Sequence, residues 1–395
     1  MEKCIKLANH QDCTGCGACV DACPKNCISF KKEGLHDYPI IADSCVKCGK
    51  CMSVCPILNK ENRDMVSMQR YYCAWNENMT DRLTSTSGGA GSAMATWANI
   101  NGYYVCGAGF DNRWYLRHVI TNDKEALEAF KGSKYLKSDT LGIFRKVKEL
   151  IASGNRILFT GTPCQCDAME HYLTDKEKGN LITLSLICHG VNSPVVWGDY
   201  VNYLEKTNGS KLVKYNFRSK SKGWRHDRGG GGKYRVFSEF SNGKKSDVPS
   251  WRNLFHCWFG FHYILRPSCF HCPYRKKERT TDIVIGDFWG LNKVLPSLET
   301  QAGASVVITT SDKGEQFLHS CENLQLIQVD ASATEKVLKG FVEKRAPEGI
   351  QKEIEVNSRF ECEYLKSSFD EMAKKYAPET YLERILASLR SRLHI

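Results

Sequence analysis

Two runs of cysteines near the start of the chain have the spacing of a metal-cluster site. The first run holds Cys13, Cys16, Cys19 and Cys23 before Pro24, and the second holds Cys45, Cys48, Cys51 and Cys55 before Pro56. Each run reads C-x2-C-x2-C-x3-C-P, the spacing at which thiolates bind cubane iron–sulfur clusters. Zinc is the alternative, but zinc sites use two spaced pairs of ligands instead of four cysteines in each of two runs.

The fourth cysteine of each run is expected to serve the other cluster. Three cysteines on a tight glycine-containing loop reach three irons of one cube, whereas the fourth, held by the turn before proline, points away. In two-cluster ferredoxins this fourth cysteine binds the opposite cluster. We therefore assign two [4Fe-4S] clusters to a first set, Cys13, Cys16, Cys19 and Cys55, and a second set, Cys45, Cys48, Cys51 and Cys23.

Three turns rich in polar and cysteine residues follow apolar, strand-like runs in the middle of the chain. Residues 156–159 lead into 160–166, residues 181–187 lead into Cys188-His189-Gly190, and residues 282–285 lead into 286–290. Apolar runs alternating with helical segments predict a sheet covered on both faces. Because ligands of such sheets lie at the carboxyl ends of the strands, we expect these turns to face one site.

A C-x2-C pair, Cys269 and Cys272, lies just before the last of these strands and also has metal-ligand spacing. Two ligands are missing, and the best-placed candidates lie at strand ends. We therefore predict a third [4Fe-4S] cluster on a third set, Cys164, Cys188, Cys269 and Cys272. A four-cysteine zinc site or simple buried thiols remain alternatives, and Cys166 or Cys257 could substitute as ligands.

Two further segments suggest anion binding, each with a plainer alternative, and a third is basic. Small residues at 84–91 precede a helical pattern at 92–100 and leave backbone N–H groups for a cofactor phosphate, or form an ordinary helix cap. Residues 131–138 read as a basic, solvent-facing turn. The basic segment 218–235, with four glycines at 229–232, is a solvated face or a lid over a phosphorylated ligand, and residues 233–240 alternate like an edge strand.

Composition limits the class of protein. The chain has 395 residues, 42% of them hydrophobic, which suits two or three soluble domains. Neither a long apolar run nor a signal peptide is recognised, so we expect a cytoplasmic protein whose 20 cysteines are reduced. The formal charge of +11 favours an acidic electron carrier or a phosphorylated cofactor over nucleic acid. The amphipathic pattern at 381–393 is expected to pack on protein, without membrane contact.

Six motifs in order resemble the beta subunit of coenzyme F420-reducing hydrogenase and its dehydrogenase relatives. They cover 85–89, 132–135, 161–165, 188–190, 267–272 and 282–290. The resemblance implies an α/β domain that holds FAD and a cubane cluster, which supports the third set. It further implies that seven residues contact FAD, which are Ser87, Gly88, Gly89, Ser133, Lys134, Tyr135 and Thr162.

The fold class expected is a two-cluster ferredoxin domain at 1–60, an α/β flavin domain with a mostly parallel sheet at 71–330, and a helical extension at 331–395. The function expected is an iron–sulfur flavoprotein oxidoreductase that converts between one-electron and two-electron chemistry. Its partners would be ferredoxin or another redox protein and a small-molecule or deazaflavin acceptor, and self-association is left open. No catalytic side chain is assigned. The alternative is an electron-relay subunit without a substrate of its own.

Overall fold

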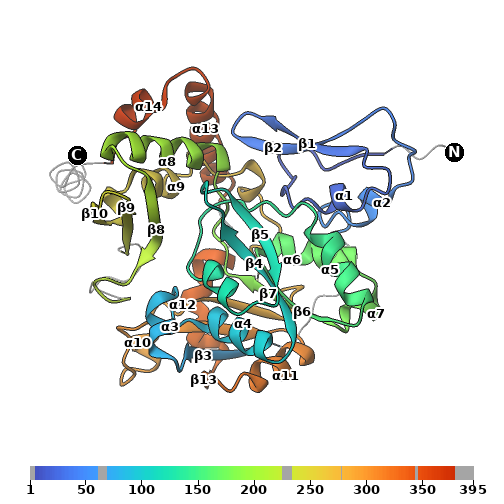
Figure 1. The fold of residues 1–395 in the computed structure, drawn as a ribbon, viewed down its shortest axis with the longest axis vertical. Helices are drawn as coiled ribbons and strands as arrows, with labels where there is room; N and C mark the ends of the chain where they lie inside the picture. The colour runs from blue at the N-terminus through green and yellow to red at the C-terminus, as the bar shows by residue number, and fades with distance from the viewer. Residues whose placement is uncertain (1–4, 61–68, 225–233, 277, 343–345, 379–395) are drawn as a thin grey trace.

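The computed structural model describes residues 5–60, 69–224, 234–276, 278–342 and 346–378. A large sheet forms the body, an N-terminal segment lies against one side of it, and a small second sheet with several helices lies on another (Figure 1). The predicted glycine-rich lid at 229–232 and the amphipathic pattern at 381–393 fall outside the described residues. The domain boundaries drawn from the sequence stay predictions.

The N-terminal segment is an internal repeat of a cysteine loop and a short helix. Each helix follows a glycine in the left-handed region, Gly17 at φ 84° and Gly49 at φ 81°. Glycine is suited to these positions because a Cβ atom is strained there. An antiparallel hairpin joins the two repeats, and the elements in chain order are α1 (Ala18–Asp21), β1 (Ile28–Glu33), β2 (His36–Ile41) and α2 (Lys50–Ser53).

The body is an eight-stranded mixed sheet with the order β13-β3-β12-β11-β7-β6-β4-β5. Its strands are β3 (Arg70–Asn76), β4 (Tyr103–Phe110), β5 (Leu116–Thr121), β6 (Arg156–Gly161), β7 (Leu181–Leu186), β11 (Ile283–Asp287), β12 (Ser305–Thr309) and β13 (Leu324–Val329). The four neighbours β11, β7, β6 and β4 pair in parallel. The predicted parallel sheet is therefore confirmed at the centre.

Both ends of this sheet are antiparallel, which the apolar runs did not predict. β4 and β5 pair as a hairpin across residues 111–115, a connection too short for a parallel crossover. At the other end, β12 and β13 run against β11 and β3. Even so, β3 runs in the same direction as the central four, so the carboxyl ends of five strands lie at one edge.

Helices cover both faces of the sheet, as predicted. On one face, α4 (Ala90–Ile100) and α11 (Asp312–Ser320) pack on a core that includes Val105, Leu158 and Val307. On the other face, α5 (Ile143–Ala152) and α6 (Pro163–Tyr172) pack on Cys106 and Phe159. Neighbouring residues such as 158 and 159 point to opposite faces because side chains alternate along a strand.

The second sheet has three antiparallel strands in the order β10-β9-β8, which are β8 (Leu212–Ser219), β9 (Arg235–Phe240) and β10 (Lys245–Pro249). The expectation of an edge strand at 233–240 is wrong, because β9 pairs on both sides. Helices pack around this sheet on an aromatic core that includes Trp197, Phe255 and Phe360; they are α8 (Pro194–Asn208), α9 (Leu254–Gly260), α13 (Pro347–Tyr364) and α14 (Phe369–Lys375).

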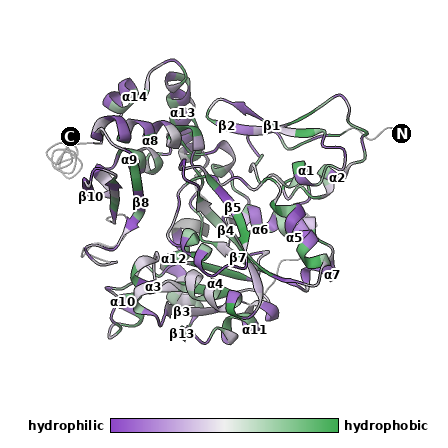
Figure 2. Cartoon of the chain, viewed as in Figure 1, coloured by the Kyte–Doolittle hydropathy of each residue, from purple (hydrophilic) through white to green (hydrophobic). Residues whose placement is uncertain are grey.

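The remaining elements are short connections and one longer helix: α3 (Met79–Thr84), η1 (Glu125–Phe130), α7 (Asp175–Lys178), η2 (Ser250–Arg252), η3 (Pro267–Cys269), α10 (Leu291–Val294) and α12 (Ala331–Val342). Figure 2 shows hydrophobic residues concentrated on the central strands and hydrophilic ones on the outer helices α8, α13 and α14. Within the described residues, no helix combines the length and apolarity needed to span a bilayer.

The N-terminal segment is fastened to the body through α1 and α5. The Asp21 carboxylate accepts the backbone N–H groups of Gly142 (2.8 Å), Phe144 (3.0 Å) and Arg145 (3.4 Å), so it caps the N-terminus of α5 from a distant part of the chain. The Thr140 hydroxyl donates to the carbonyl of Cys16 at 2.5 Å. These contacts fix the first cysteine loop against the large sheet.

The expectation that residues 131–138 form a solvent-facing turn is wrong for their second half. Leu136, Lys137 and Ser138 are all buried. Lys137 lies over the ring of Phe30 at 5.0 Å, so β1 of the N-terminal segment covers it. Composition favoured solvent exposure because lysine is rarely buried, and only the docking of the N-terminal segment removes this turn from water.

Candidate metal centres

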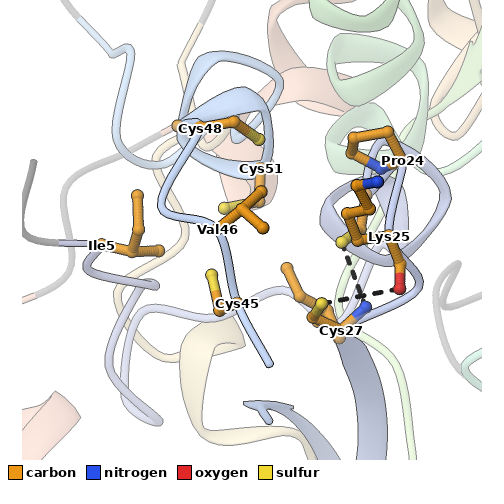
Figure 3. A pocket seen from close by; sticks show the side chains of 11 residues that line it. Ile5, Pro24, Lys25, Cys27, Cys45, Val46, Cys48 and Cys51 are labelled. Carbon is orange, nitrogen blue, oxygen red and sulfur yellow. Dashed lines mark hydrogen bonds between the residues drawn. The ribbon is translucent and has the colours of Figure 1, made fainter. Parts of the chain in front are cut away.

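The second set of cysteines surrounds one cavity. Cys45, Cys48 and Cys51 come from the loop leading into α2, and Cys23 comes from the turn before Pro24. These residues surround about 300 Å³ of space, part of which is open to solvent, and apolar side chains such as Ile5 also line it. In Figure 3, Cys45, Cys48 and Cys51 stand around this space with Ile5 on one side and Cys27 on the other. The four cysteines assigned from spacing are therefore brought together.

The first set is gathered deeper in the chain. Burial, together with the neighbouring charges of Cys55 and Cys13, raises the pKa of the Cys16 thiol to about 12. Burial likewise raises the pKa of Cys19, with contributions from the same three thiols. Buried thiols that oppose one another's ionisation lose their protons readily only to a cation that binds all of them, as a cluster's irons do.

The third set lines a cavity at the carboxyl edge of the central strands. Cys164 follows β6, Cys188 follows β7, and Cys269 and Cys272 come from η3 and the turn after it. These residues surround about 570 Å³ of space, part of which is open to solvent. Cys166 and Cys257 do not line it: the Cys166 thiol is directed to the carbonyl of Leu184. The cysteines preferred from the sequence are thus the ones that the fold assembles.

The three sets follow one another in space. Thr14, from the first cysteine loop, lines the cavity of the third set. Arg266, which directly precedes the turn that carries Cys269, donates to the carbonyl of Cys13 at 2.8 Å, so the first and third sets lie side by side. The second set adjoins the first, because Cys19 packs against Cys23 and Cys51, and its Cys48 is exposed at the outer end. The chain therefore presents a line of cysteine groups that begins at the surface and ends at the sheet.

The chemistry of these donor groups fits cubane clusters. Among the described residues, no three His, Cys, Asp or Glu side chains converge closely enough to hold a single metal ion. A cubane cluster takes one thiolate at each iron, so its ligands surround a volume, as the second and third sets do. Bound clusters would supply one-electron transfer.

The predicted flavin contacts come from two loops that the fold joins. The N–H group of Ser133 donates to the hydroxyl of Thr86 at 2.8 Å. Several of the predicted contact groups are already engaged by the chain: the Ser87 hydroxyl donates to the carbonyl of Ala304 (2.6 Å), and the Gly88 N–H donates to the hydroxyl of Ser305 (3.0 Å). Ser87 and Gly88 therefore attach this loop to the start of β12.

The remaining predicted flavin contacts, Gly89, Lys134 and Thr162, lie in different surroundings. Gly89 begins α4 without any side-chain cap, so the first N–H groups of that helix are directed to the carboxyl edge of the sheet. The Lys134 ammonium donates to two backbone carbonyls, and burial lowers its pKa to about 7. Thr162 lines the cavity of the third set, where its hydroxyl lies 3.2 Å from the sulfur of Cys164. Thr162 therefore lies with the cysteines.

Tyr135 contacts a buried ion pair that the spacing of residues in the sequence could not predict. Its hydroxyl accepts from Arg218 at 3.0 Å, and Arg218 also binds both carboxylate oxygens of Asp287 at 2.9 and 3.2 Å. The indole N–H of Trp224 donates to the same carboxylate at 2.9 Å. Three segments distant in the sequence thus meet beside the end of β11. The signal in the sequence was weak: a basic residue at the end of a strand and an acidic one at the end of another.

His189, beside Cys188, contacts a second histidine. The Nε2 atoms of His189 and His262 lie 2.8 Å apart, and His262 Nδ1 lies 3.1 Å from the carboxylate of Glu353 in α13. His262 has φ 62°, an uncommon backbone conformation for a residue other than glycine. The cavity wall is therefore tied to the C-terminal helices.

These features define the class: an iron–sulfur electron-transfer protein built on an α/β sheet. Residues 12–58 match the family described as 4Fe-4S dicluster domain. Residues 154–335 match the family described as the C terminus of the coenzyme F420 hydrogenase/dehydrogenase beta subunit. The chain is therefore an electron-transfer protein related to that beta subunit, and the resemblance predicted from the six motifs is confirmed.

Two similar proteins carry related names. In Methanosarcina mazei, the F(420)H(2) dehydrogenase component designated F is 23% identical over 242 residues, which cover 58% of this chain and 68% of that protein. A chain in a structure of the F420-reducing [NiFe] hydrogenase complex from Methanosarcina barkeri is 17% identical and has a TM-score of 0.47. That similarity covers 72% of this chain and 90% of the other.

Proposed function

We propose that this protein is an iron–sulfur flavoprotein that passes single electrons along three [4Fe-4S] clusters between a redox partner and a two-electron acceptor. The observation that carries the proposal is the continuous line of three cysteine sets from the surface to the sheet edge. Electron transfer needs short steps between centres, and the adjacency of the first and third sets supplies one. The segments predicted from the sequence, 1–60, 71–330 and 331–395, would be the corresponding functional units.

Each cysteine set has its own part in this proposal. The second set would receive or deliver electrons at the surface, because the exposed Cys48 lies where a partner can approach. The first set would act as the middle relay, since Cys13 and Cys16 are buried. The third set would pass electrons to the sheet edge, where Tyr274 and Arg279 help to exclude water from the cavity.

FAD would bind at the same edge, held by the group predicted from the resemblance. The uncapped N-terminus of α4, after Gly89, offers N–H groups to a phosphate. Lys134 suits an anion, because burial lowers its pKa and the described residues offer its ammonium two backbone carbonyls and no carboxylate. Bound FAD would supply the exchange between one-electron and two-electron chemistry. The acceptor would be a small molecule or a deazaflavin such as coenzyme F420, the class named in the relative from M. mazei.

A second candidate function is an electron-relay subunit without a substrate of its own. The relative from M. mazei is named as a subunit of a dehydrogenase, which favours this reading. The two candidates differ in what the isolated chain does: the flavoenzyme reoxidises with a small-molecule acceptor, whereas the relay reoxidises only with a partner protein. Stopped-flow reoxidation with each kind of acceptor separates them.

Anaerobic purification with iron, sulfide and flavin analysis tests the proposal directly. We expect about twelve irons and one FAD per chain, following four irons for each cubane. Replacing one ligand in each set, by Cys16→Ala, Cys48→Ala and Cys269→Ala, is expected to remove about four irons each time. Cys166→Ala is the matched control, because Cys166 is buried outside the cavities and its loss should leave iron unchanged.

Three outcomes would contradict parts of this proposal. Zinc in place of iron would end the electron-transfer function altogether. Eight irons per chain, all of them retained in Cys269→Ala, would contradict the third cluster. Clusters without bound flavin would leave the electron-relay subunit as the remaining candidate function.

A further inference from the structure

Arg266 occupies the junction between the first and third sets. Its side chain has no exposed surface, and it directly precedes the turn that carries Cys269. Its Nε atom donates to the carbonyl of Cys13 at 2.8 Å, and Nη2 donates to the carbonyl of Asp37 at 3.0 Å. Nη2 also lies 3.8 Å from the sulfur of Cys13. The guanidinium is therefore held against the first set while its backbone belongs to the third.

The charge of Arg266 has no carboxylate partner in the described chain. Its bonds are to carbonyls and a sulfur, and no ion pair joins it to any Asp or Glu that the structure describes. Its Nη1 atom is buried and has no hydrogen-bond partner among those residues. Lys137 lies close by and is also buried; burial and the charge of Arg266 lower its pKa, and the carboxylates of Asp139 and Asp37 offset this only in part. A buried, uncompensated charge is strongly unfavourable.

The groups that can compensate this charge are the cysteine thiolates. Arg266 contacts the sulfur of Cys13, and its backbone carbonyl accepts the N–H group of Cys269 at 2.9 Å. Both neighbouring sets therefore lie within its electrostatic reach. Four thiolates on a cubane leave net negative charge at each set, and this charge increases by one when the cluster takes up an electron.

The first cysteine loop is shaped around this side chain. Gly15 has φ 68°, and a Cβ atom there would lie 2.9 Å from Arg266 Cζ and 2.9 Å from Lys137 Cε. The ring of Tyr38 covers the guanidinium at 4.6 Å. The loop between Cys13 and Cys16 thus leaves space for two cations that the rest of the fold supplies.

We propose that Arg266 is the built-in counter-ion of the first and third clusters and raises the reduction potential of the cluster on the first set. This inference rests on the proposed cluster function and names a positioning residue for it. With both clusters bound, a transferred electron would leave one cluster, which would be oxidised, and enter its neighbour, which would be reduced. No proton moves, because the guanidinium stays protonated throughout. Arg266 favours the reduced state of the first set and so keeps the electron at the junction.

An anaerobic redox titration followed by electron paramagnetic resonance tests this inference. In Arg266→Gln, we expect reduction of the first-set cluster to become at least tenfold less favourable, a potential lower by about 59 mV for one electron. Arg266→Lys retains the charge and should restore most of the potential. The second-set cluster, whose cavity Arg266 does not line, serves as the reference inside the same sample.

The outcomes separate this inference from the proposed function. If the parent protein carries no cluster, the proposed function fails first. If it carries its clusters but Arg266→Gln leaves the first-set potential unchanged, or shifts the reference cluster equally, only the inference fails. If Arg266→Gln does not assemble the cluster, the decision falls to Arg266→Lys: assembly at the parent potential supports the need for a positive charge, and failure to assemble overturns it.

Discussion

Removing the Asp21 carboxylate should loosen the N-terminal segment from the sheet. Asp21 is buried and accepts three backbone N–H groups at the start of α5, whose own cap residue is Gly142. Losing a helix cap costs about 0.5–2 kcal/mol, and leaving a buried N–H group unpaired costs about 1–3 kcal/mol. Because α5 has no other side-chain cap at this end, we expect Asp21→Ala to lower the free energy of unfolding by about 2–4 kcal/mol.

Anaerobic guanidinium unfolding, followed by tryptophan fluorescence, measures this change. Iron content is determined first, because Asp21 lies two residues from Cys19 and from Cys23, and a lost cluster would also lower stability. Asp21→Asn keeps an acceptor oxygen and should cost less than Asp21→Ala. Asp43→Ala is the control, since Asp43 is exposed on the same segment.

The reasoning would be refuted by an Asp21→Ala protein that keeps its iron and unfolds within about 0.5 kcal/mol of the parent, the range of an ordinary surface change. It would also be refuted if Asp43→Ala cost as much. Either result would mean that the N-terminal segment is held by its apolar contacts alone.

Three further predictions concern the sheet edge. Gly190→Ala should cost about 2 kcal/mol or more and reduce third-set iron, because Gly190 has φ 149° and a Cβ atom would lie 2.6 Å from Leu265. Arg218→Met should cost about 3–5 kcal/mol in urea unfolding, because it leaves the Asp287 carboxylate buried without its cation. Burial lowers the pKa of His118 to about 4. The unfolded chain therefore binds more protons, and stability should fall by up to about 3 kcal/mol as pH drops from about 6.5 toward 4, measured by thermal unfolding at each pH.

Matched changes keep these predictions open to contradiction. Gly198→Ala, inside α8 with open space around it, should stabilise by about 0.5–1 kcal/mol, and an equal cost at both glycines would contradict the steric argument. The control for Arg218→Met is Lys245→Met, which removes the cation of a solvent-accessible pair with Glu239. It should change the free energy of unfolding by no more than about 1 kcal/mol. In His118→Gln the pH dependence should become smaller but not vanish, because burial also lowers the pKa of His36 and of His256. An unchanged slope would assign the dependence to those groups.

The local pattern of the chain was enough for the parts whose physics is local. Four cysteines in a C-x2-C-x2-C-x3-C-P run share one loop and one turn, so their neighbours in sequence are also their neighbours in space. The assignment of Cys23 to the opposite loop followed from the same rule, and the second-set cavity has that composition. The carboxyl ends of β6 and β7 likewise share one edge because their strands are parallel.

Only the tertiary structure decided the features that join distant segments. Residues 131–138 read as an exposed basic turn, yet Lys137 is buried because the hairpin of the N-terminal segment covers it. The antiparallel ends of the sheet depend on which strands pair, which apolar runs do not encode. Arg266 belongs to no motif recognised in the sequence, and its proposed role follows from its contact with Cys13, which lies 253 residues earlier in the chain. The spacing of residues in the sequence predicts contacts within one loop. The groups that surround a buried charge come from distant segments and are set only when the whole chain has folded.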